Sequence, residues 1–441
     1  MGSSAASRSP RLPLRMRRPS LGLLRRNADY RRLWTAQTVS QFGSQVSGLA
    51  LPLVAVITLH LTAFKVSLLG TVDMLPFLLF ALPAGAWVDR IARRPVLIAA
   101  DLGRALALAS VPVAAAIAHI TYAQLLVVGF VTGTLTVLFD VAYQSYLPFL
   151  VERQDLVEGN SKLEVSRSGA SIAGPGIAGP LVQWITAPYA VAVDAASFVL
   201  SALSVLRIRA AEVVEPPTEQ PSLVREIREG LRYLVRDGRW RAMATFVAVF
   251  NLGTGMTGPL MLVYAVRRLD LTPGELGLTF MLGSFGWLLG ALVAGRVGRS
   301  LRVGPALAVL GFLGGLPFFL VPLAPRSFAI PVLVLAQAVT GVAIVIFNVI
   351  AISLYQTHVP PRMLGRMNAS RRWIVWGTIP LGSLLGGALS AWIGLRTTLF
   401  VGAGISTIAG VALLARPILS LATVDDDAGA AGDGGVAPPA E

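Results

Sequence analysis

Long apolar stretches recur along this chain, and arginine lies on every second connection between them. In a water-soluble protein, nothing concentrates basic residues on every second connection. In a chain that crosses a bilayer repeatedly they concentrate in this way, because Lys and Arg are retained on the cytoplasmic side of the membrane. The pattern therefore indicates a protein that crosses a membrane many times.

The apolar stretches are long enough to be membrane spans, because about 18 apolar residues suffice to cross the hydrocarbon core as a helix. Only 14% of the residues are charged, while 54% are hydrophobic. About twelve spans are expected, at roughly residues 33–60, 65–88, 95–118, 122–147, 163–186, 188–207, 241–266, 275–297, 303–324, 328–356, 372–394 and 396–418. The predicted fold class is an all-α membrane protein with twelve transmembrane helices.

The basic residues predict the orientation. The arm before the first span and the connections after the even-numbered spans hold most of them, including Arg18, Arg153, Arg228, Arg299 and Arg366. The opposite connections hold Lys65, Arg267, Arg268, Arg326 and Arg396. This asymmetry predicts that the N- and C-termini are both cytoplasmic.

Composition also argues against several other classes of protein. The net charge of +14 would suit a nucleic-acid surface, but its sorting by connection favours topology instead. The chain has no cysteine, which excludes disulfides and thiolate metal sites. Its histidines, His60, His119 and His358, are too scattered to suggest a metal cluster. We expect no nucleic-acid partner, no metal and no cofactor.

The spans divide into two halves. Residues 1–30 form a basic arm and residues 419–441 a tail, and both are expected to be disordered and cytoplasmic. Residues 31–207 form the N-terminal six-helix half and residues 241–418 the C-terminal six-helix half. The cytoplasmic linker 208–240 contains an amphipathic helix, expected at the inner leaflet or solvated. Its apolar face has Leu223, Ile227, Leu231 and Leu234, and its basic face Arg225, Arg228, Arg232 and Arg236.

The two halves repeat each other at a constant separation of 208 residues, which holds without a gap over about 50 residues. Matching positions include Phe139 and Phe347, Asn160 and Asn368, Gly179 and Gly387, and Trp184 and Trp392. Parallel repeats related by an axis along the membrane normal enclose a central cavity that can open to either side.

The connection after the second span carries the sequence Gly85-Ala-Trp-Val-Asp89-Arg90-Ile-Ala-Arg93-Arg94. It resembles the signature G-x-x-x-D-R-x-G-R-R of the major facilitator superfamily, with Ala92 where glycine is usual. The resemblance implies that this connection latches one conformational state, with Asp101 and Arg104 of the third span paired together or joined to it. The alternative, that the arginines serve only topology, stays open.

Further segments resemble one bacterial branch, that of enterobactin exporters and macrolide efflux permeases: residues 143–148, 156–160, 193–198 and 99–104. The resemblance implies a multi-pass protein of the bacterial cell (inner or plasma) membrane. The fifth span is similar to the antiporter motif G-x-x-x-G-P-x-x-G-G at Gly174, Pro175 and Gly179, with Ala170 and Ala178 replacing two glycines. Ordinary packing of small residues is the alternative.

Carboxylates within membrane spans are costly and therefore suggest function. Asp140 follows Thr132 and Thr136 at i+4 spacing on the fourth span and is the first candidate proton carrier, with Arg167 as a nearby cation. Asp73 on the second span is the other candidate. Asp194 is assigned to packing, because the resemblance places its span at the periphery.

A substrate cavity needs a polar wall. The resemblance implies that spans one, four, seven and ten line the cavity. Their polar residues are Gln37, Gln41, Gln45, Thr136, Asn251, Thr254, Gln337 and Asn348. The glutamines follow one stripe of the first helix, although they could instead bond neighbouring helices.

These observations lead to one principal hypothesis. It is a secondary active transporter, monomeric in the bilayer, that exports a small amphipathic drug, siderophore or secondary metabolite in exchange for protons by alternating access. The alternatives are a proton-coupled importer of a polar solute and, from another class, a membrane enzyme. An enzyme is disfavoured because no nucleophile with a base, and no metal cluster, is found.

Overall fold

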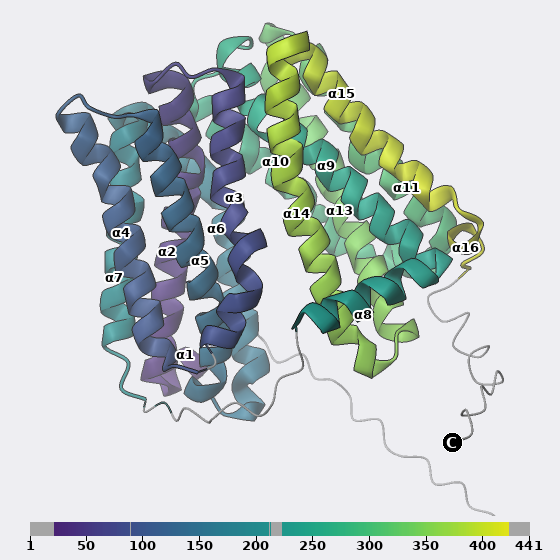
Figure 1. The fold of residues 1–441 in the computed structure, drawn as a ribbon, viewed down its shortest axis with the longest axis horizontal. Helices are drawn as coiled ribbons and strands as arrows, with labels where there is room; N and C mark the ends of the chain where they lie inside the picture. The colour runs from purple at the N-terminus through teal and green to yellow at the C-terminus, as the bar shows by residue number, and fades with distance from the viewer. Residues whose placement is uncertain (1–21, 89, 211, 213–222, 423–441) are drawn as a thin grey trace, which may run out of the picture.

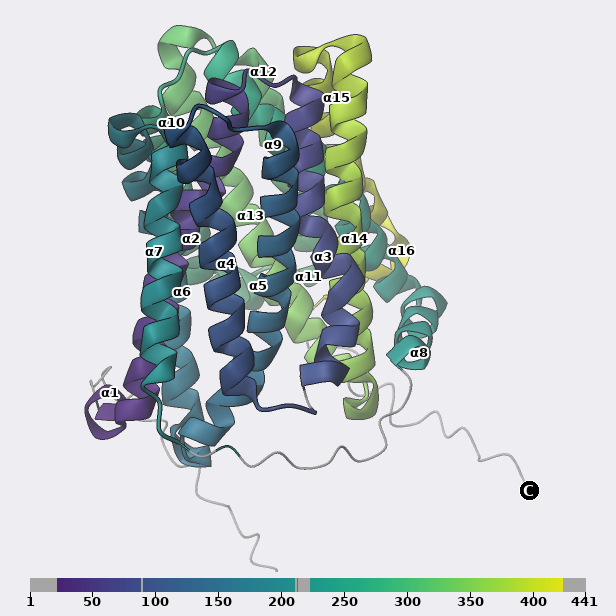
Figure 2. The same ribbon diagram turned by 60° about the vertical axis from the view of Figure 1, so that its left-hand side comes forward.

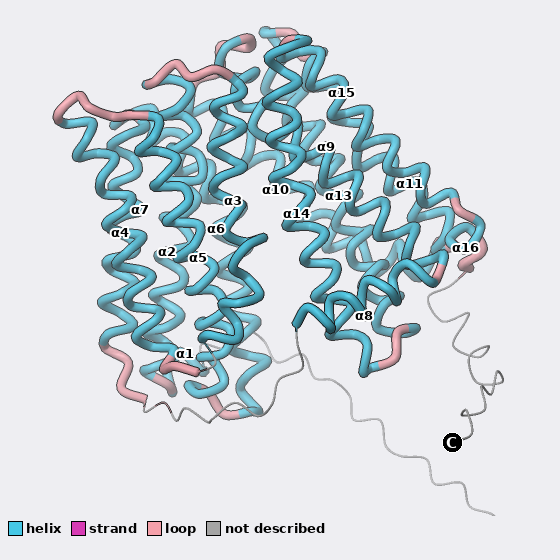
Figure 3. Tube along the Cα trace, in the orientation of Figure 1, coloured by secondary structure: helices cyan, strands magenta, loops and turns pink. Residues whose placement is uncertain are grey.

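The computed structural model describes residues 22–88, 90–210, 212 and 223–422. All regular structure in these ranges is helical (Figure 3). Most of the arm 1–30, Asp89, linker residues 213–222 and most of the tail 419–441 lie outside the described residues.

The N-terminal half is a bundle of six long helices. A short helix, α1 (Gly22–Arg26), precedes it, and a 3-10 turn, η2 (Arg153–Asp155), joins its fourth and fifth long helices. The long helices are α2 (Ala28–Leu53), continued by the π-helical η1 (Val54–Thr58), α3 (Ala63–Val88), α4 (Arg93–Ala116), α5 (Tyr122–Leu150), α6 (Leu156–Ile185) and α7 (Ala187–Leu206).

The C-terminal half repeats this plan. Its long helices are α9 (Gly238–Arg267), α10 (Pro273–Ser300), α11 (Val303–Gly315) with η3 (Leu316–Phe319) and α12 (Leu320–Leu323), α13 (Ala329–His358), α14 (Pro361–Ile393) and α15 (Leu395–Ile408) with η5 (Ala409–Leu414). The short η4 (Arg326–Phe328) precedes α13, and α16 (Arg416–Leu419) follows η5.

Eleven helices of the described chain are long and apolar enough to cross a membrane. The twelfth long helix is α6, whose first turns carry charged residues such as Lys162 and Arg167. The predicted all-helical fold of two six-helix halves is confirmed. The side of the membrane on which the termini lie stays a prediction.

The halves meet at one end of the molecule and diverge at the other. Figures 1 and 2 show α3 beside α14 at the upper end, and Figure 1 shows their lower ends apart. On the far side of the bundle α6 packs against α10. The lower end is the one with the basic connections, α1 and the linker helix α8 (Leu223–Arg236).

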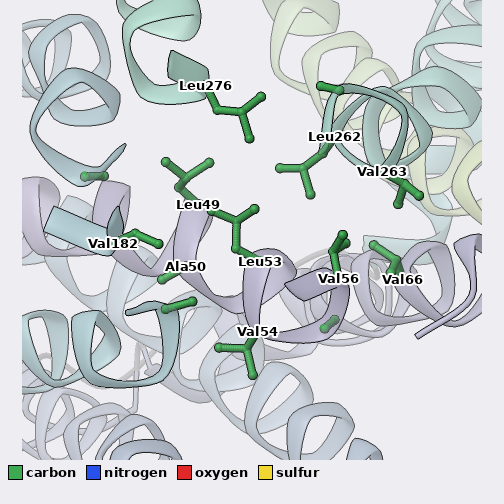
Figure 4. Close-up of a cluster of buried hydrophobic side chains, with 14 of the residues drawn as sticks. Leu49, Ala50, Leu53, Val54, Val56, Val66, Val182, Leu262, Val263 and Leu276 are labelled. Carbon is green, nitrogen blue, oxygen red and sulfur yellow. The ribbon is translucent and has the colours of Figure 1, made fainter. Parts of the chain in front are cut away.

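An apolar seal closes the upper end between the halves. Figure 4 shows Leu49, Leu53 and Val66 of the N-terminal half against Leu262 and Leu276 of the C-terminal half. All five are at most 7% exposed. Close packing of aliphatic side chains leaves no room for water, so this end of the cavity is shut.

Hydrogen bonds between the halves surround the seal. Ser383 Oγ donates to Ser67 O at 2.7 Å, and the Gly274 amide donates to Gln183 Oε1 at 3.0 Å. Arg267 Nη2 donates to Leu61 O at 2.5 Å. All of these bonds must break if the halves separate here.

The linker helix α8 packs on the C-terminal half, against α14 and α9. Leu234 is 1% exposed and belongs to the core around Trp240 and Phe246. The arginines of the opposite face are exposed: Arg225, Arg228, Arg232 and Arg236. The side chains of Leu223 and Ile227 lie outside those described. Leu234 therefore binds protein, whereas Val235 and the basic face are exposed to water or headgroups.

Candidate functional site

A cavity of about 590 Å³ lies below the apolar seal, and we call it the inner chamber. Residues of α2, α3, α4, α5, α6, α7, α9 and α10 line it. Its wall is mostly apolar and includes Met74, Phe77 and Phe280. Two carboxylates, Asp73 and Asp194, also line it. The inner chamber is thus an apolar space of ligand size with a few charged groups in its wall.

Asp73 is placed in the chamber wall by a close approach of α3 to α5. A Cβ at Gly133 would collide with the backbone carbonyl of Asp73 and lie 3.1 Å from Pro76 Cγ. Only glycine therefore fits at this crossing. Asp73 makes no hydrogen bond or ion pair with any other described residue. Its carboxylate is free to take a proton or a cationic group from the chamber.

Arg104 is held by a buried cluster at the chamber wall. Arg104 Nη2 lies 2.5 Å from Asp101 Oδ1, and Ser201 Oγ donates to Asp101 Oδ2 at 2.7 Å. The guanidinium Cζ lies 4.0 Å from the ring centroid of Phe198 and 4.4 Å from that of Phe139. Asp101 is completely buried. Because an unpaired buried charge is very costly, the two ionic groups must be held together.

Asp194 also lines the inner chamber, although the sequence assigned it to packing. It is 1% exposed and accepts a hydrogen bond of 3.0 Å from Ser197 Oγ. A Cβ at Gly43 of α2 would lie 2.6 Å from Asp194 Oδ1. Gly43 lets α7 approach α2 so closely that Asp194 becomes part of the wall. The sequence contains Gly43 and Asp194, but nothing in it shows that the two residues are neighbours.

A second cavity, the polar compartment, opens below the chamber and has a volume of about 500 Å³. It contains the predicted glutamine stripe, Gln37, Gln41 and Gln45, together with Asp140 and Arg167. Gln45 lines both cavities, so the polar compartment adjoins the inner chamber.

The predicted partners Asp140 and Arg167 are both in the polar compartment. Arg167 Nη2 bonds Glu164 Oε1 at 2.8 Å, and Asp140 adds its charge at longer range. Asp140 also acts on Arg104 through charge. Tyr143 and Gln144 of α5 also line the compartment, across from the glutamines of α2. The compartment is thus a polar network around Asp140.

A third cavity, the aromatic compartment, has a volume of about 390 Å³ and lies between α3, α5 and α14. Asp140 and Gln144 line it as well as the polar compartment. Trp373 and Trp376 supply its wall from the other half. Phe77 lines both the inner chamber and the aromatic compartment, and Asp140 lines both the aromatic and the polar compartments. The three cavities therefore adjoin one another.

Thr136 lines the inner chamber, as the sequence predicts for a cavity residue. The four candidates on α9 and α13 do not line any of the three cavities. Thr254 Oγ1 donates to Asn251 O within α9 at 3.2 Å. Gln337 packs against Gly283 of α10, and Asn348 is exposed. In the described residues, the polar walls come mainly from the N-terminal half.

The signature residues after α3 are tied to the linker. Glu212 accepts hydrogen bonds from the backbone amides of Arg93 and Arg94, at 2.8 Å and 3.3 Å, and its Oε1 lies 3.2 Å from Arg93 Nη1. Arg90 is exposed, and Asp89 lies outside the described residues. Because α4 begins at Arg93, Glu212 also neutralises the positive end of that helix. Within the described chain, Arg93 and Arg94 thus join the linker to their own half.

The antiporter-like segment of α6 lies at two close helix crossings. A Cβ on Gly174 would lie 2.6 Å from Gln45 Cβ of α2. Gly179 faces Gly277 of α10 across the interface between the halves, and the carbonyl of Pro175 points at the same glycine. Small residues at these positions let the helix backbones touch.

Within the described residues, no group of three or more His, Asp or Glu side chains could hold a metal ion. The cavities instead offer carboxylates, amides and aromatic rings, which can bind and release a solute and a proton.

Comparison with known proteins agrees with this architecture. The family described as Major Facilitator Superfamily matches residues 33–377. The multidrug efflux pump Tap of Mycolicibacterium fortuitum is 30% identical over 362 residues, which cover 76% of this chain and 83% of the pump. Macrolide efflux protein A of Streptococcus pyogenes is 22% identical, over 82% of this chain and 90% of that protein.

Solved structures share the fold. The nucleoside transporter NupG superposes with a TM-score of 0.73 at 14% identity, covering 88% of this chain and 98% of that one. A bacterial homologue of the iron transporter ferroportin, in an inward-facing state, gives 0.71 at 15% identity, covering 89% and 98%.

The relatives are efflux pumps, and the chain has a series of long apolar helices around cavities. It is therefore a multi-pass protein of the bacterial cell membrane, and a transporter of small molecules rather than an enzyme. The chain belongs to the major facilitator superfamily.

Proposed function

We propose that this protein exports a small amphipathic compound in exchange for protons, working as a monomer that alternates between two openings. The cavities support export of such a compound, because an apolar chamber adjoins a polar one. The relatives described as a multidrug pump and a macrolide efflux protein support the direction.

One observation carries the coupling. Asp73 lies in the wall of an apolar chamber that is sealed at one end, and it has no bonding partner among the described residues. An ionised carboxylate in such a place is costly unless a proton or a cation neutralises it. Proton and cargo therefore compete for the same carboxylate, which is the requirement for exchange.

The cycle follows from this competition. With the seal closed, cargo enters from the end with the basic connections, which the charge asymmetry predicts to be cytoplasmic. Cargo displaces the proton from Asp73, or from Asp140 lower in the pathway, and favours the state open to the other side. Rebinding of a proton after release favours the return. Each ligand shifts the balance only by its different affinity for the two states.

The test uses everted membrane vesicles, radiolabelled erythromycin as a macrolide probe, and an imposed pH gradient. We expect accumulation that stops when the gradient is collapsed. Asp73→Asn is expected to reduce gradient-driven accumulation at least tenfold while exchange of labelled for unlabelled probe continues. Asp270→Asn, at an exposed carboxylate paired with Arg326, is the matched control and is expected to behave as wild type.

Two results would contradict the proposal. One is accumulation that does not respond to the pH gradient. The other is full gradient-driven activity in the double variant Asp73→Asn, Asp140→Asn. Uptake into right-side-out vesicles with none into everted ones would instead indicate an importer.

A further inference from the structure

A groove on the outer surface of the C-terminal half lies between α10, α11 and α13 and has a volume of about 570 Å³. We call it the side groove. The described residues that line it line none of the three cavities of the candidate site. We propose that the side groove binds an anionic phospholipid, with an acyl chain in the groove and the phosphate held by Arg296 and Arg299. This inference does not depend on the proposed function.

A close crossing of α10 and α13 forms the floor of the side groove. A Cβ on Gly286 would lie 2.4 Å from Ala338 Cα, and a Cβ on Gly290 would lie 3.0 Å from Val342 Cα. Small residues let the two helix backbones touch here, so the larger side chains beside the crossing stand above its floor. Leu313 of α11 belongs to the wall.

The walls of the side groove are apolar and exposed. Phe285, Leu289 and Leu292 of α10 are 52%, 53% and 66% exposed, and Leu313 is 39% exposed. All four belong to helical segments that are long and apolar enough to cross a membrane. In a bilayer such side chains meet hydrocarbon, so a lipid acyl chain is the occupant that suits this groove.

The same face of α10 becomes basic toward the lower end of the molecule. Five residues at intervals of four, three, four and three share one stripe of the helix: Phe285, Leu289, Leu292, Arg296 and Arg299. Both arginines are exposed, and neither side chain has an ion pair or hydrogen bond with the rest of the described chain. Their guanidinium groups are therefore available to a phosphate, whose oxygens match the donor geometry of arginine.

The length of this stripe matches the depth of one lipid leaflet. Phe285 and Arg296 are 11 residues apart. At about 1.5 Å per residue this is about 16 Å along the helix, and half of a hydrocarbon core of about 30 Å is about 15 Å. A phosphate bound at Arg296 therefore places its acyl chain alongside the apolar part of the stripe. The charge asymmetry predicts that this end faces the cytoplasm, where the leaflet carries anionic lipids.

A fluorescent label beside the groove and a quencher on the lipid test the proposal. The chain has no native cysteine, so one engineered thiol gives a unique site for a bimane label. Val309→Cys places the label on α11 next to the groove, at a residue that is 57% exposed and not part of the lining. Leu106→Cys, at a residue of α4 that is 75% exposed, is the control position in the other half. The full-length protein in detergent is titrated with phosphatidylglycerol or phosphatidylcholine, each with the same nitroxide-labelled acyl chain.

We expect phosphatidylglycerol to quench the label at Val309→Cys with a midpoint about tenfold below that of phosphatidylcholine, equivalent to about 1.4 kcal/mol. The double variant Arg296→Gln, Arg299→Gln is expected to lose this preference. The matched control Arg153→Gln, Arg207→Gln removes two exposed arginines from the lower end of the other half and is expected to keep it. At Leu106→Cys the two lipids are expected to have nearly equal midpoints. Unlabelled phosphatidylglycerol is expected to reverse the quenching, whereas inorganic phosphate at the same concentration is not.

Four results would overturn the proposal: equal midpoints at Val309→Cys, an unchanged preference when Arg296 and Arg299 are replaced, the same preference at Leu106→Cys, or reversal by inorganic phosphate as complete as by the lipid. The last result would indicate an anion site that does not use the groove. None of these measurements involves transport or a pH gradient, so failure of this proposal is distinguishable from failure of the proposed function.

Discussion

Gly179 of α6 and Gly277 of α10 face each other at the interface between the halves, so closely that a Cβ on Gly179 would lie 2.8 Å from Gly277 Cα. This crossing is close to the apolar seal, because Leu276 of the seal and Val182 of α6 belong to the same buried cluster. The described arrangement, sealed at the upper end, therefore depends on two glycines that belong to different halves.

Gly179→Ala is expected to weaken the sealed arrangement. The new methyl group meets backbone on α10, and overpacking of this kind costs about 1–3 kcal/mol, which shifts the balance of states roughly 5- to 150-fold. In a Val66→Cys background, whose thiol would sit in the seal, we expect labelling to accelerate at least fivefold. Gly169→Ala is the matched control on the same helix, because nothing lies within 4 Å of its built Cβ. Equal labelling in both variants would contradict this account.

Asp101→Asn is expected to destabilise the protein by about 3–5 kcal/mol, because Arg104 loses the ionic partner that accompanies it in the interior. Thermal unfolding in detergent would measure the loss. Glu164→Gln, which removes a pair whose partners are 59% and 65% exposed, is expected to change stability by less than about 1 kcal/mol. The double variant Asp101→Asn, Arg104→Gln should recover part of the loss; no recovery would argue against the ionic explanation.

Glu212→Gln is expected to loosen the linker. The substitution removes the negative charge that binds Arg93 and the first amides of α4. Limited trypsin digestion is then expected to cut faster at Arg207 and Arg209, by roughly three- to tenfold if about 1 kcal/mol is lost. Glu229→Gln, in a partly exposed pair with Arg225, provides the comparison and should leave the digestion rate unchanged. Unaltered cleavage in Glu212→Gln would show that the linker is held by other contacts.

Glu158, in the first turn of α6 and before the predicted span, is expected to make the docking of α1 pH-dependent. The hydrogen bond from the Leu23 amide, with Lys162 and Arg26 nearby, lowers the pKa of Glu158 below its ordinary value of 4.5. A lowered pKa stabilises the docked state above that value, and the stabilisation is lost as the pH falls through the lowered pKa.

Hydrogen exchange of the Leu23 amide, corrected for the intrinsic rate, would measure this dependence. Protection is expected to decrease as the pH falls below 4.5. Glu158→Gln should have lower protection and no such pH dependence. Protection that stays constant through this range in the wild-type protein would rule out Glu158 as the cause.

Several parts of the site follow from the sequence. The glutamine stripe of α2 lines the polar compartment, because its spacing fixes one face of a helix whatever its neighbours are. The i, i+3 spacing of Asp101 and Arg104 likewise allows their pairing in any helical context. Proton coupling at Asp73 or Asp140 stays a prediction.

Other parts could not be predicted. Asp194 lines the chamber because Gly43 admits α7, and Gln337 is turned toward α10 instead of a cavity. Glu212 binds Arg93 over a separation of 119 residues. These relationships depend on the rotation of each helix and on its neighbours, which local spacing does not specify.

The sequence by itself determined the spans, their division into two halves and the segregation of the arginines. The spans and the segregation of the arginines follow from free energies of transfer into or across the bilayer, which add up along the chain residue by residue, and the two halves follow from the repeat at a separation of 208 residues. Only the tertiary structure decided which end is sealed, which carboxylates share a cavity and which aromatic rings line it. Those features arise from contacts between helices distant in the chain, and a rotation of one helix by a single residue would change them.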